Sequence, residues 1–335
     1  MTIDLQGRDF LKELDFTPAE WAYLVELTGE LKAARRDGRE QRRLAGMNLA
    51  LVFDNAASRT RGSFEVASYD QGAQITYLDQ SGSQMGDKES IADTAMVLAR
   101  YYDGIQFRGA QHESMEALAL HSSVPVWNGL TDDWHPTQSL CDTFTMLEAS
   151  NKPASEIRFA FLGDGRNNVA NSLLVGGAMM GMEVRIVAPE DRQPLPAVAA
   201  AARAVASETG GKVILTEDVA AGVKGVDFVH TDIWVSMSEP KEAWASRVRE
   251  LLPYQVNASV MAATGNPHAR FMHGLPALHD LGTQLARDLL EITGLRNGYE
   301  VTDQVFKSDA SLVFEQAENR MHIIKAVMVA TLVGT

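Results

Sequence analysis

Residues 49–67 read LALVFDNAASRTRGSFEVA and predict a β-strand that leads into an α-helix. The apolar run 49–53 is typical of a buried strand, and 63–67 has the pattern of a helix. Between them, the Ser-Arg-Thr-Arg segment 58–61 combines two hydroxyls and two guanidiniums with the free N–H groups of a helix start. Such a segment favours a bound phosphate, because helix N-termini carry partial positive charge and Arg donates forked hydrogen bonds. A solvated Arg-rich turn has the same composition, so other segments must decide between the two interpretations.

Apolar strands and helical patterns alternate along the whole chain, which predicts βαβ units with parallel sheets. The predicted strands cover residues 48–53, 74–78, 104–107, 124–127, 158–163, 183–188, 212–216, 226–230, 256–258 and 270–272. The predicted helices cover residues 62–72, 89–102, 113–121, 137–149, 197–206 and 315–332. The fold class that follows is α/β, with two doubly wound parallel-sheet domains.

Chain length and a polar segment predict two domains. The 335 residues exceed what one hydrophobic core usually organises. Residues 150–155, SNKPAS, are polar and contain a proline, so we place the junction there. We expect a first domain over 1–150 and a second domain that begins at residue 151.

The composition disfavours several classes of protein. A net charge of −14 disfavours a nucleic-acid partner, and it means that an anionic substrate needs a local cluster of Arg and His. The single cysteine, Cys141, rules out an internal disulfide and fits a reducing cytoplasm. The N-terminal residues lack a secretory signal pattern, and no apolar stretch is long enough to span a bilayer. We therefore expect a cytoplasmic protein without a nucleic-acid or membrane partner.

Two segments of the first half place polar side chains where a ligand could bind. Arg108 closes the strand 104–107, at the edge where open α/β sheets bind ligands. His135 and Gln138, in the segment HPTQ, can together bind a carbonyl group and its NH2 group. A surface arginine and a structural histidine are the alternatives at this point.

Two segments of the second half have a complementary chemistry. Asp232 and Ser236 follow the strand 226–230, where a carboxylate and a hydroxyl suit an ammonium group. Asn167 and Asn168 stand at a helix start and can hold a carboxylate. For Asp232 and Ser236, helix capping is an equally good interpretation.

Two motifs that would indicate other chemistry are incomplete. Residues 163–172, GDGRNNVANS, resemble a dinucleotide fingerprint but lack its third glycine, and Glu190 is the nearest acid to a ribose position. The eight histidines form neither HExxH nor another tight ligand pair with a thiolate. We therefore expect neither a nicotinamide cofactor nor a metal.

Taken together, these segments resemble the ornithine carbamoyltransferases, within the aspartate/ornithine carbamoyltransferase superfamily. The resemblance covers almost the whole chain, and several motifs in one order are more specific than any single motif. The matching segments are SRTRGSFEVA at 58–67, KES at 88–90, DGI at 103–105, HPTQ at 135–138, NN at 167–168, DIWVSM at 232–237, residues 261–276, and EQAENRMH at 315–322.

The resemblance implies a reaction and a division of tasks between the domains. The family transfers a carbamoyl group from carbamoyl phosphate to the δ-amine of L-ornithine, giving L-citrulline and phosphate. Its first domain binds carbamoyl phosphate, its second, here 151–319, binds ornithine, and its last helix, here 320–335, returns to the first domain. Its catalytic units are trimers in which a neighbour's loop, here with Gln84, reaches each site, and it uses no metal or organic cofactor. The activity serves arginine biosynthesis or citrulline breakdown, and the sequence does not distinguish the two.

The resemblance also assigns roles to individual residues of this chain. The catalytic residues would be Arg108, His135 and Arg320. The carbamoyl phosphate ligands would be Ser58, Arg59, Thr60, Gln84, Arg108, His135, Gln138, Gly274, Leu275 and Arg320. The ornithine ligands would be Asn168, Asp232, Ser236 and Met237, the last through its backbone. Arg108 and His135 would stabilise the oxygen that becomes anionic when the amine attacks, and the enzyme would act by positioning and charge neutralisation.

The chain departs from the family pattern at three turns. Ala57 and Ser58 stand where the family has Ser and Thr, Gly274 stands where it has Cys, and Ser238 stands where it has Gly. Ala57 removes a phosphate hydroxyl, and Gly274 removes a thiol beside the attacking amine. An inhibitor that mimics the tetrahedral intermediate uses such groups more fully than substrates do. One hypothesis is therefore a slower, inhibitor-tolerant isozyme that gives antimetabolite resistance, and the alternatives are neutral drift and a changed acceptor.

Three other functions stay open on the sequence. The first is carbamoyl transfer to putrescine or a modified ornithine, although putrescine has no carboxylate for the residues after strand 226–230 to bind. The second is a non-catalytic ligand-binding subunit, which the retention of Arg59, Arg108, His135 and Gln138 disfavours. The third is a nicotinamide oxidoreductase, which the incomplete fingerprint disfavours.

Overall fold

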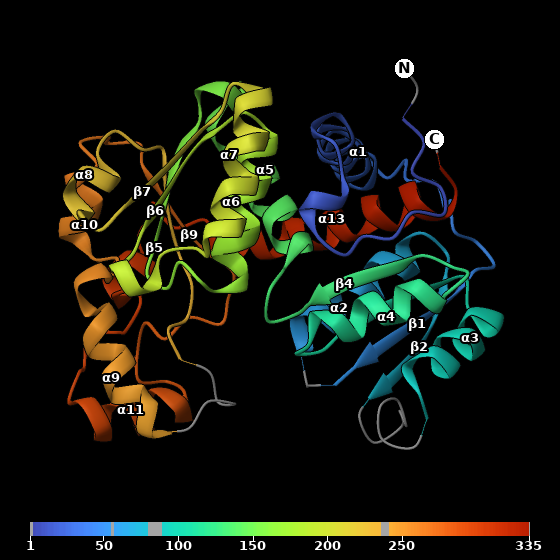
Figure 1. Ribbon diagram of the computed structural model, residues 1–335. Coiled ribbons are helices and arrows are strands. Elements are labelled where there is room, and N and C mark those ends of the chain that lie inside the picture. The colour runs from blue at the N-terminus through green and yellow to red at the C-terminus, as the bar shows by residue number, and fades with distance from the viewer. Residues whose placement is uncertain (1–2, 55–56, 80–88, 236–240, 335) are drawn as a thin grey trace. The chain divides into compact units, whose positions relative to one another are not determined.

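Two parallel β-sheets form the framework of the computed structural model, which describes residues 3–54, 57–79, 89–235 and 241–334 (Figure 1). The first sheet, in the order β2-β1-β3-β4, contains β1 (Asn48–Phe53), β2 (Gln74–Asp79), β3 (Gly104–Arg108) and β4 (Val126–Leu130). The second, in the order β7-β6-β5-β8-β9, contains β5 (Arg158–Leu162), β6 (Glu183–Val187), β7 (Lys212–Thr216), β8 (Phe228–Thr231) and β9 (Arg270–His273). The neighbouring strands of both sheets pair in parallel, which confirms the predicted α/β fold.

Helices connect these strands and cover the sheets. The described helices are α1 (Pro18–Arg36), α2 (Ser58–Asp70), α3 (Ile91–Tyr101), α4 (His112–His121), α5 (Pro136–Ser150), α6 (Asn168–Met179), α7 (Pro196–Thr209), α8 (Val219–Val223), α9 (Lys241–Leu251), α10 (Ala258–Ala263), α11 (Gln284–Thr293), α12 (Asp303–Phe306) and α13 (Val313–Leu332). Short 3-10 helices lie at Glu13–Asp15, Ala154–Glu156, Glu190–Arg192 and Leu252–Tyr254. Within the described ranges, no helix combines the length and the apolar character needed to cross a membrane.

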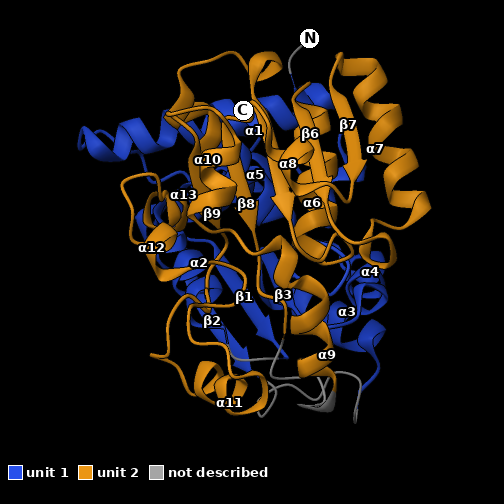
Figure 2. Ribbon diagram, turned by 90° about the vertical axis from the view of Figure 1, so that its left-hand side faces the viewer, with its two compact units in different colours: residues 1–144, 318–335 blue, residues 145–317 orange. Residues whose placement is uncertain are grey.

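The chain divides into two compact units, which Figure 2 colours separately. Unit 1 comprises Met1–Phe144 and Glu318–Thr335, and unit 2 comprises Thr145–Ala317. Helices α5 and α13 each contribute residues to both units. The larger, C-terminal part of α13 therefore belongs to the unit that holds the first sheet.

Helices cover both faces of the sheet in unit 1. On one face, α3 and α4 pack against alternate strand residues in a buried cluster that includes Leu98 and Ile105. On the other face, Phe64 of α2 stacks on Trp127 of β4 with ring centroids 6.4 Å apart. Trp127 Nε1 also donates a hydrogen bond to Thr331 Oγ1 of α13 at 2.9 Å. The C-terminal helix thus forms part of the core of unit 1.

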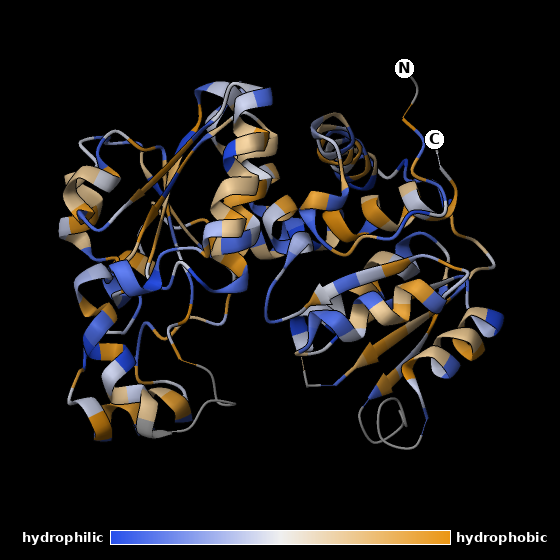
Figure 3. Ribbon diagram, viewed as in Figure 1, coloured by the Kyte–Doolittle hydropathy of each residue, from blue (hydrophilic) through white to orange (hydrophobic). Residues whose placement is uncertain are grey.

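The sheet in unit 2 is also covered on both faces. Helix α6 is buried from Val169 to Met179, and it is mostly in orange shades in the hydropathy view (Figure 3). Its Gly177 lies so close to the sheet that an added Cβ would be 2.6 Å from Val184. The other face packs against α8, α10 and α12 through a second cluster, which includes Val229. Because both faces are covered, the inner strands β5 and β8 are almost fully buried, and their apolar residues made them visible in the sequence, whereas the edge strand β7 is only partly buried.

Three predicted strands differ from the observed ones, and one of them, predicted at 226–230, begins two residues later, at Phe228. The predicted strand 256–258 is wrong, because Val256 forms only an isolated bridge and Asn257 caps helix α10 through a hydrogen bond from Val260 N. The strand predicted at 124–127 begins two residues later, at Val126. Pro125 precedes it, and proline has no N–H group to donate to a neighbouring strand.

Several helices also differ from the predictions. Helix α1 and helices α8 to α12 were not predicted, and α3 and α13 begin two residues from their predicted starts. For α1, Thr17 and Glu20 form a capping box around Pro18, which is a recognisable start signal. Helix α2 begins at Ser58 and not at residue 62. The Ser-Arg-Thr-Arg segment is therefore the first turn of the helix itself, so its side chains and its backbone N–H groups share one helix end.

Candidate functional site

Thr60 lies at the centre of a hydrogen-bonded group of polar residues in unit 1. It belongs to the first turn of α2, which follows β1, and its side chain is buried. Its Oγ1 accepts hydrogen bonds from Arg108 Nη1 at 2.7 Å and from Arg320 Nη2 at 3.0 Å. Both bonds are charge-assisted, and a hydroxyl that accepts twice keeps its own proton for a third partner. Thr60 is therefore placed to donate to an anion at the start of the helix.

Arg108 brings positive charge to the carboxyl end of β3. Burial, together with the positive charges of Arg320 and Arg59, lowers the pKa of Arg108 to about 9. This direction means that the surroundings disfavour the charged guanidinium, and a bound anion would have the opposite effect. The strand end thus concentrates the positive charge that an anionic ligand needs on a chain with net charge −14.

His135 lies just before α5 and is buried. Its Nε2 is 2.9 Å from Arg320 Nη2, and its Nδ1 is 3.4 Å from Thr137 Oγ1. Because a guanidinium only donates, we assign Nε2 as the acceptor and place the ring proton on Nδ1. Burial, and then the charges of Arg320 and Arg108, hold the pKa of His135 well below its usual value. His135 is therefore a neutral imidazole in this arrangement.

Gln138 completes the group, since its Oε1 accepts a hydrogen bond from Arg320 Nη1 at 3.1 Å. Arg320 is the member that joins the others, because its guanidinium contacts Thr60, His135 and Gln138. The structure thus brings together five residues predicted from four separate segments: Thr60, Arg108, His135, Gln138 and Arg320. These come from α2, β3, α5 and its preceding turn, and α13.

The remaining predicted residues of unit 1 lie at the edge of this group or outside the described ranges. Ser58 and Arg59 lie in the first turn of α2, and both are exposed. Ala57 occupies the N-cap position, where its side chain offers no oxygen to the helix start. The predicted residue Gln84 lies outside the described residues.

The predicted site residues of unit 2 follow three neighbouring strands. The predicted ornithine ligands Asn168 and Asp232 follow β5 and β8, with Asn168 at the start of α6. Gly274 and Leu275, predicted as carbamoyl phosphate ligands, follow β9 in the same unit. Strand β8 pairs with β5 on one side and with β9 on the other, with Leu162, Thr231 and His273 in register. Their carboxyl ends therefore meet at one edge of the sheet. Ser236 and Met237 lie outside the described residues.

Asp232 has the opposite electrostatic setting from Arg108. Burial raises the pKa of Asp232, and the nearby charge of Glu300 raises it further. The charges of His273 and His230 and a hydrogen bond from the Ile233 N–H group lower it in part. An ammonium group beside Asp232 would favour the carboxylate in the same way as these histidines.

Glu300 is a buried carboxylate that the sequence analysis missed. Its Oε1 accepts a hydrogen bond from Leu278 N and lies 3.4 Å from His273 Nε2. His273 Nδ1 in turn accepts from Leu275 N at 2.9 Å, and Leu275 has a positive φ of 51°. The loop after β9 is therefore held at Leu275 and at Leu278 by the buried side chains of His273 and Glu300. The only sign in the sequence that Glu300 is buried was its position between the apolar residues Tyr299 and Val301.

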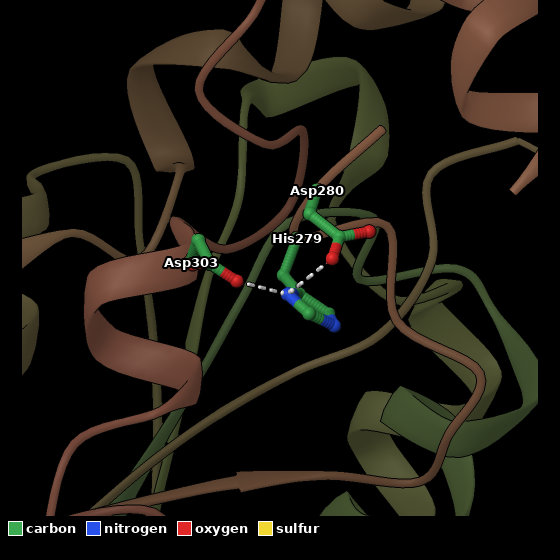
Figure 4. A group of neighbouring side chains, drawn as sticks. All are labelled: His279, Asp280 and Asp303. Carbon is green, nitrogen blue, oxygen red and sulfur yellow. Dashed lines mark hydrogen bonds and ion pairs between the residues drawn. The ribbon is translucent and has the colours of Figure 1, made fainter. Parts of the chain in front are cut away.

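A separate cluster of titratable side chains in unit 2 consists of His279, Asp280 and Asp303 (Figure 4). His279 Nδ1 is 2.6 Å from Asp303 Oδ1 and 3.9 Å from Asp280 Oδ2. Lys307 Nζ also binds Asp303, at 2.9 Å from Oδ1. The lysine supplies the positive charge that the carboxylate of Asp303 needs, so we interpret this group as an ion-pair cluster.

Comparison with known proteins identifies the family. The chain matches the family models for the carbamoyl-P binding domain of aspartate/ornithine carbamoyltransferases over residues 8–148 and for the Asp/Orn binding domain over residues 155–331. The chain belongs to the aspartate/ornithine carbamoyltransferase family. The five joined residues all lie in stretches that these two models match.

Individual members of this family resemble the chain over nearly its full length. A catabolic ornithine carbamoyltransferase of Chromobacterium violaceum is 53% identical over 99% of both chains. The solved ornithine carbamoyltransferase of Pyrococcus furiosus has a TM-score of 0.91 at 37% identity, with 100% of both chains covered. The anabolic ornithine carbamoyltransferase of Campylobacter jejuni has a TM-score of 0.83 at 32% identity, covering 96% of this chain and 97% of the other.

Proposed function

We propose that this chain transfers the carbamoyl group of carbamoyl phosphate to the δ-amine of L-ornithine, giving L-citrulline and phosphate. The observation that carries the proposal is the group in which Arg320 joins Thr60, His135 and Gln138, with Arg108 on the same Thr60 hydroxyl. The group lies in the unit that contains the carbamoyl-P binding domain match. The relatives named above are ornithine carbamoyltransferases, so ornithine is favoured over putrescine as the acceptor.

In unit 1, the donor would be held as an anion. Ser58, Arg59, Thr60 and the free N–H groups of the first turn of α2 would bind the phosphate, where the helix end favours negative charge. Arg108 would donate to the carbonyl oxygen, and the developing negative charge there would be stabilised more than the neutral carbonyl. Gln138 would bind the NH2 group of the donor.

His135 needs one rearrangement to serve the same oxygen. Its Nε2 accepts from Arg320, whereas a role as oxyanion donor needs a proton on Nε2. The proton would move from Nδ1 to Nε2 as Arg320 turns toward the donor phosphate. Because the pKa of His135 is held well below its usual value, this change is between two neutral tautomers.

In unit 2, the acceptor would be held by groups of opposite character. Asp232, with Ser236 and the backbone of Met237, would bind the amino-acid end of ornithine together with Asn168. The neutral δ-amine would then attack the carbonyl carbon, and the C–O bond to phosphate would break as the tetrahedral intermediate collapses. Phosphate leaves with the electron pair of the broken C–O bond and takes up the proton that the amine nitrogen loses, and no covalent enzyme intermediate forms.

The direct test is citrulline formation from ornithine and carbamoyl phosphate by the purified chain. Putrescine serves as the competing acceptor in a parallel assay. Citrulline formation with little ureido product from putrescine supports the proposal, and the reverse preference would contradict it. Arg108→Ala serves as the inactive control, and unchanged turnover in that variant would favour a site elsewhere.

Of the two roles that the sequence leaves open, a catabolic role is favoured over arginine biosynthesis. The relative named catabolic is 53% identical, whereas the structure named anabolic is 32% identical. Growth on citrulline or arginine as nitrogen source, with and without the gene, tests this part. A requirement for the gene only in medium that lacks arginine would contradict it.

A homotrimer is the proposed assembly. Unit 1 leaves large apolar side chains exposed on α2 and α3: Val66, Tyr69, Met96, Val97 and Tyr101. Val66 and Tyr69 lie three residues apart on α2, and Val97 and Tyr101 lie four residues apart on α3, so each helix presents an exposed apolar stripe of its own, of a kind that subunit contacts cover. Light scattering after size exclusion measures the mass, and a single 36.6 kDa species would contradict the proposal.

The inhibitor-tolerant form is retained as a proposal about Ala57 and Gly274. Ala57 contributes no hydroxyl at the start of α2, and Gly274 contributes no side chain beside Leu275. The test restores Ser at position 57 and Cys at position 274 and measures turnover and inhibition by a phosphinyl ornithine analogue. Inhibition that is the same before and after the two changes would contradict tolerance.

A further inference from the structure

Asp142 is a buried carboxylate next to the donor-binding group of unit 1. It lies one helical turn after Gln138 on α5, and its side chain is 0% exposed. Gln138 Nε2 donates a hydrogen bond to Asp142 Oδ1 at 2.7 Å. The other end of the same amide, Oε1, accepts from Arg320 Nη1 at 3.1 Å. A fully buried carboxylate is costly, so its position behind a binding residue requires a reason.

The two partners of Gln138 permit only one orientation of its amide. A carboxylate accepts hydrogen bonds and a guanidinium only donates them. With Nε2 toward Asp142 and Oε1 toward Arg320, both contacts are attractive. A flipped amide would set two acceptors against each other at Asp142 and two donors against each other at Arg320. The orientation therefore follows from chemistry, even where the two ends of an amide are hard to tell apart by shape.

This orientation decides what Gln138 can recognise. The amide oxygen has two lone pairs, and Arg320 uses one of them. The oxygen faces Arg320, whose guanidinium also contacts Thr60 and His135, so a second donor from a ligand in this group can use the other lone pair. An acceptor at this place fits an N–H group of a ligand and not a methyl group or a second acceptor. The chemical class that it selects is an acyl phosphate whose acyl group carries an NH2.

We propose that Asp142 is a positioning residue that fixes Gln138 with its amide oxygen toward the donor and thereby selects carbamoyl phosphate over other acyl phosphates. The proposal rests on the proposed carbamoyl transfer. Asp142 acts through Gln138. Asp142 is also distinct from the residues predicted from the sequence motifs, which include Gln138 but not Asp142.

The first experiment measures Asp142→Asn with carbamoyl phosphate and with acetyl phosphate as a competing ligand. The asparagine can rotate to donate or to accept, so it no longer fixes the amide of Gln138. We expect the KM for carbamoyl phosphate to rise roughly tenfold, which corresponds to the loss of one hydrogen bond to a charged group. The inhibition constant of acetyl phosphate, which has a methyl in place of the NH2, should stay close to the wild-type value. Equal losses for both ligands would overturn the proposal, because a merely structural role affects both.

The second experiment exchanges the two functional groups. Gln138→Glu sets two carboxylates against each other and should lower kcat/KM strongly. Adding Asp142→Asn restores a donor and acceptor pair with the original net charge, since the introduced asparagine can donate to the introduced carboxylate. We expect the double variant to be at least roughly tenfold more active than Gln138→Glu alone, by the same hydrogen-bond argument. Additive losses would overturn the proposal, and this comparison stays informative even if Asp142→Asn alone folds poorly.

The controls separate this proposal from the proposed function. Asp37→Asn removes an exposed carboxylate of unit 1 and should leave all constants unchanged. If the unmodified chain forms no citrulline, the proposed function fails. If it forms citrulline but the exchange gives no recovery, only the role of Asp142 fails.

Discussion

The candidate donor site of unit 1 and the candidate acceptor site of unit 2 are built on the same plan with opposite charges. Both lie at the carboxyl ends of parallel strands, and both contain a charged group that burial disfavours. In unit 1 burial lowers the pKa of Arg108 to about 9, and in unit 2 it raises the pKa of Asp232. Each site thus disfavours its own charged residue until a ligand of opposite charge binds. The comparison teaches that charge, more than fold, distinguishes the two halves.

The histidines of the two units differ in their neighbours. His135 in unit 1 is buried beside guanidiniums, and burial and the charges of Arg320 and Arg108 hold its pKa well below the usual value. His273 in unit 2 accepts a hydrogen bond at Nδ1 from Leu275 N, and its Nε2 lies 3.4 Å from Glu300 Oε1. The same residue type therefore acts as a hydrogen-bonding group in both units, beside guanidiniums in one and beside a carboxylate in the other.

Removing the guanidinium of Arg108 in unit 1 should have the largest effect on catalytic activity. In Arg108→Ala the carbonyl oxygen loses a charged donor, and the Thr60 hydroxyl loses its hydrogen bond from Arg108 Nη1. We expect kcat to fall by about 10²–10³-fold, the usual range for an oxyanion donor. Steady-state citrulline assays measure this. A loss confined to the KM for ornithine would break the assignment of this region to the donor.

Replacing the carboxylate of Asp232 in unit 2 with a neutral amide should have the next largest effect on catalytic activity. In Asp232→Asn the shape is kept while the charge that would hold the ammonium group is lost. We expect the KM for ornithine to rise by roughly 10- to 100-fold, from about 1.5–3 kcal/mol for a charged hydrogen bond. The dissociation constant of carbamoyl phosphate, measured by calorimetry, should stay unchanged. If the two ligands weaken equally, the division of charge between the units is wrong.

The two units should also respond to acid in opposite directions. Burial and the charges of Lys325, Lys32 and Arg35 lower the pKa of His322 in unit 1 to about 4. Unfolded chains protonate this histidine near a pH of about 6.5, so its contribution to stability is present above that pH and is lost as the pH falls toward the folded-state value. For Asp232 the raised pKa has the reverse sign, because the folded state takes up the proton first.

Urea unfolding at about pH 7 and about pH 5 checks the contribution of His322. Across this interval the shift of His322 corresponds to about 2 kcal/mol of lost stability. His322→Gln should remove that part of the pH dependence, whereas His121→Gln, an exposed position of the same unit, should not. Equal pH slopes in the unmodified chain and both variants would exclude His322 as the source.

The sequence predicted the parts of each site that local rules govern. Arg108 at a strand end, the helix start at 58–61 and the HPTQ segment were visible because strand ends and helix starts have fixed chemistry. The assignment of Arg320 came only from the family resemblance, since a residue inside a long helix carries no local signal of its partners. Its contacts with Thr60, His135 and Gln138 depend on the packing of α13 in unit 1.

Other features were missed for related reasons. Glu300 contacts residues that lie more than twenty positions away in the sequence, and the burial of a carboxylate such as Asp142 cannot be read from its sequence neighbours alone. The strand predicted at 256–258 failed because Asn257 provides a helix cap that overrides the short apolar pattern. The parallel sheets themselves were predictable, since strands buried on both faces are continuous apolar runs.

The smallest predicted effect concerns the start of α2, where unit 1 would bind its ligand. Ala57 is the N-cap residue and offers no side-chain oxygen to the first-turn N–H groups. In α6 of unit 2, Asn167 occupies the equivalent position and accepts from Ala170 N at 2.7 Å. Ala57→Ser should therefore add about 1 kcal/mol to the free energy of unfolding. Asn167→Ala should remove a similar amount, and urea unfolding of both variants measures the difference. If Ala57→Ser leaves stability unchanged while it tightens carbamoyl phosphate binding, the helix start serves the ligand and not the fold, and the two units then differ in the use of their helix caps as well as in charge.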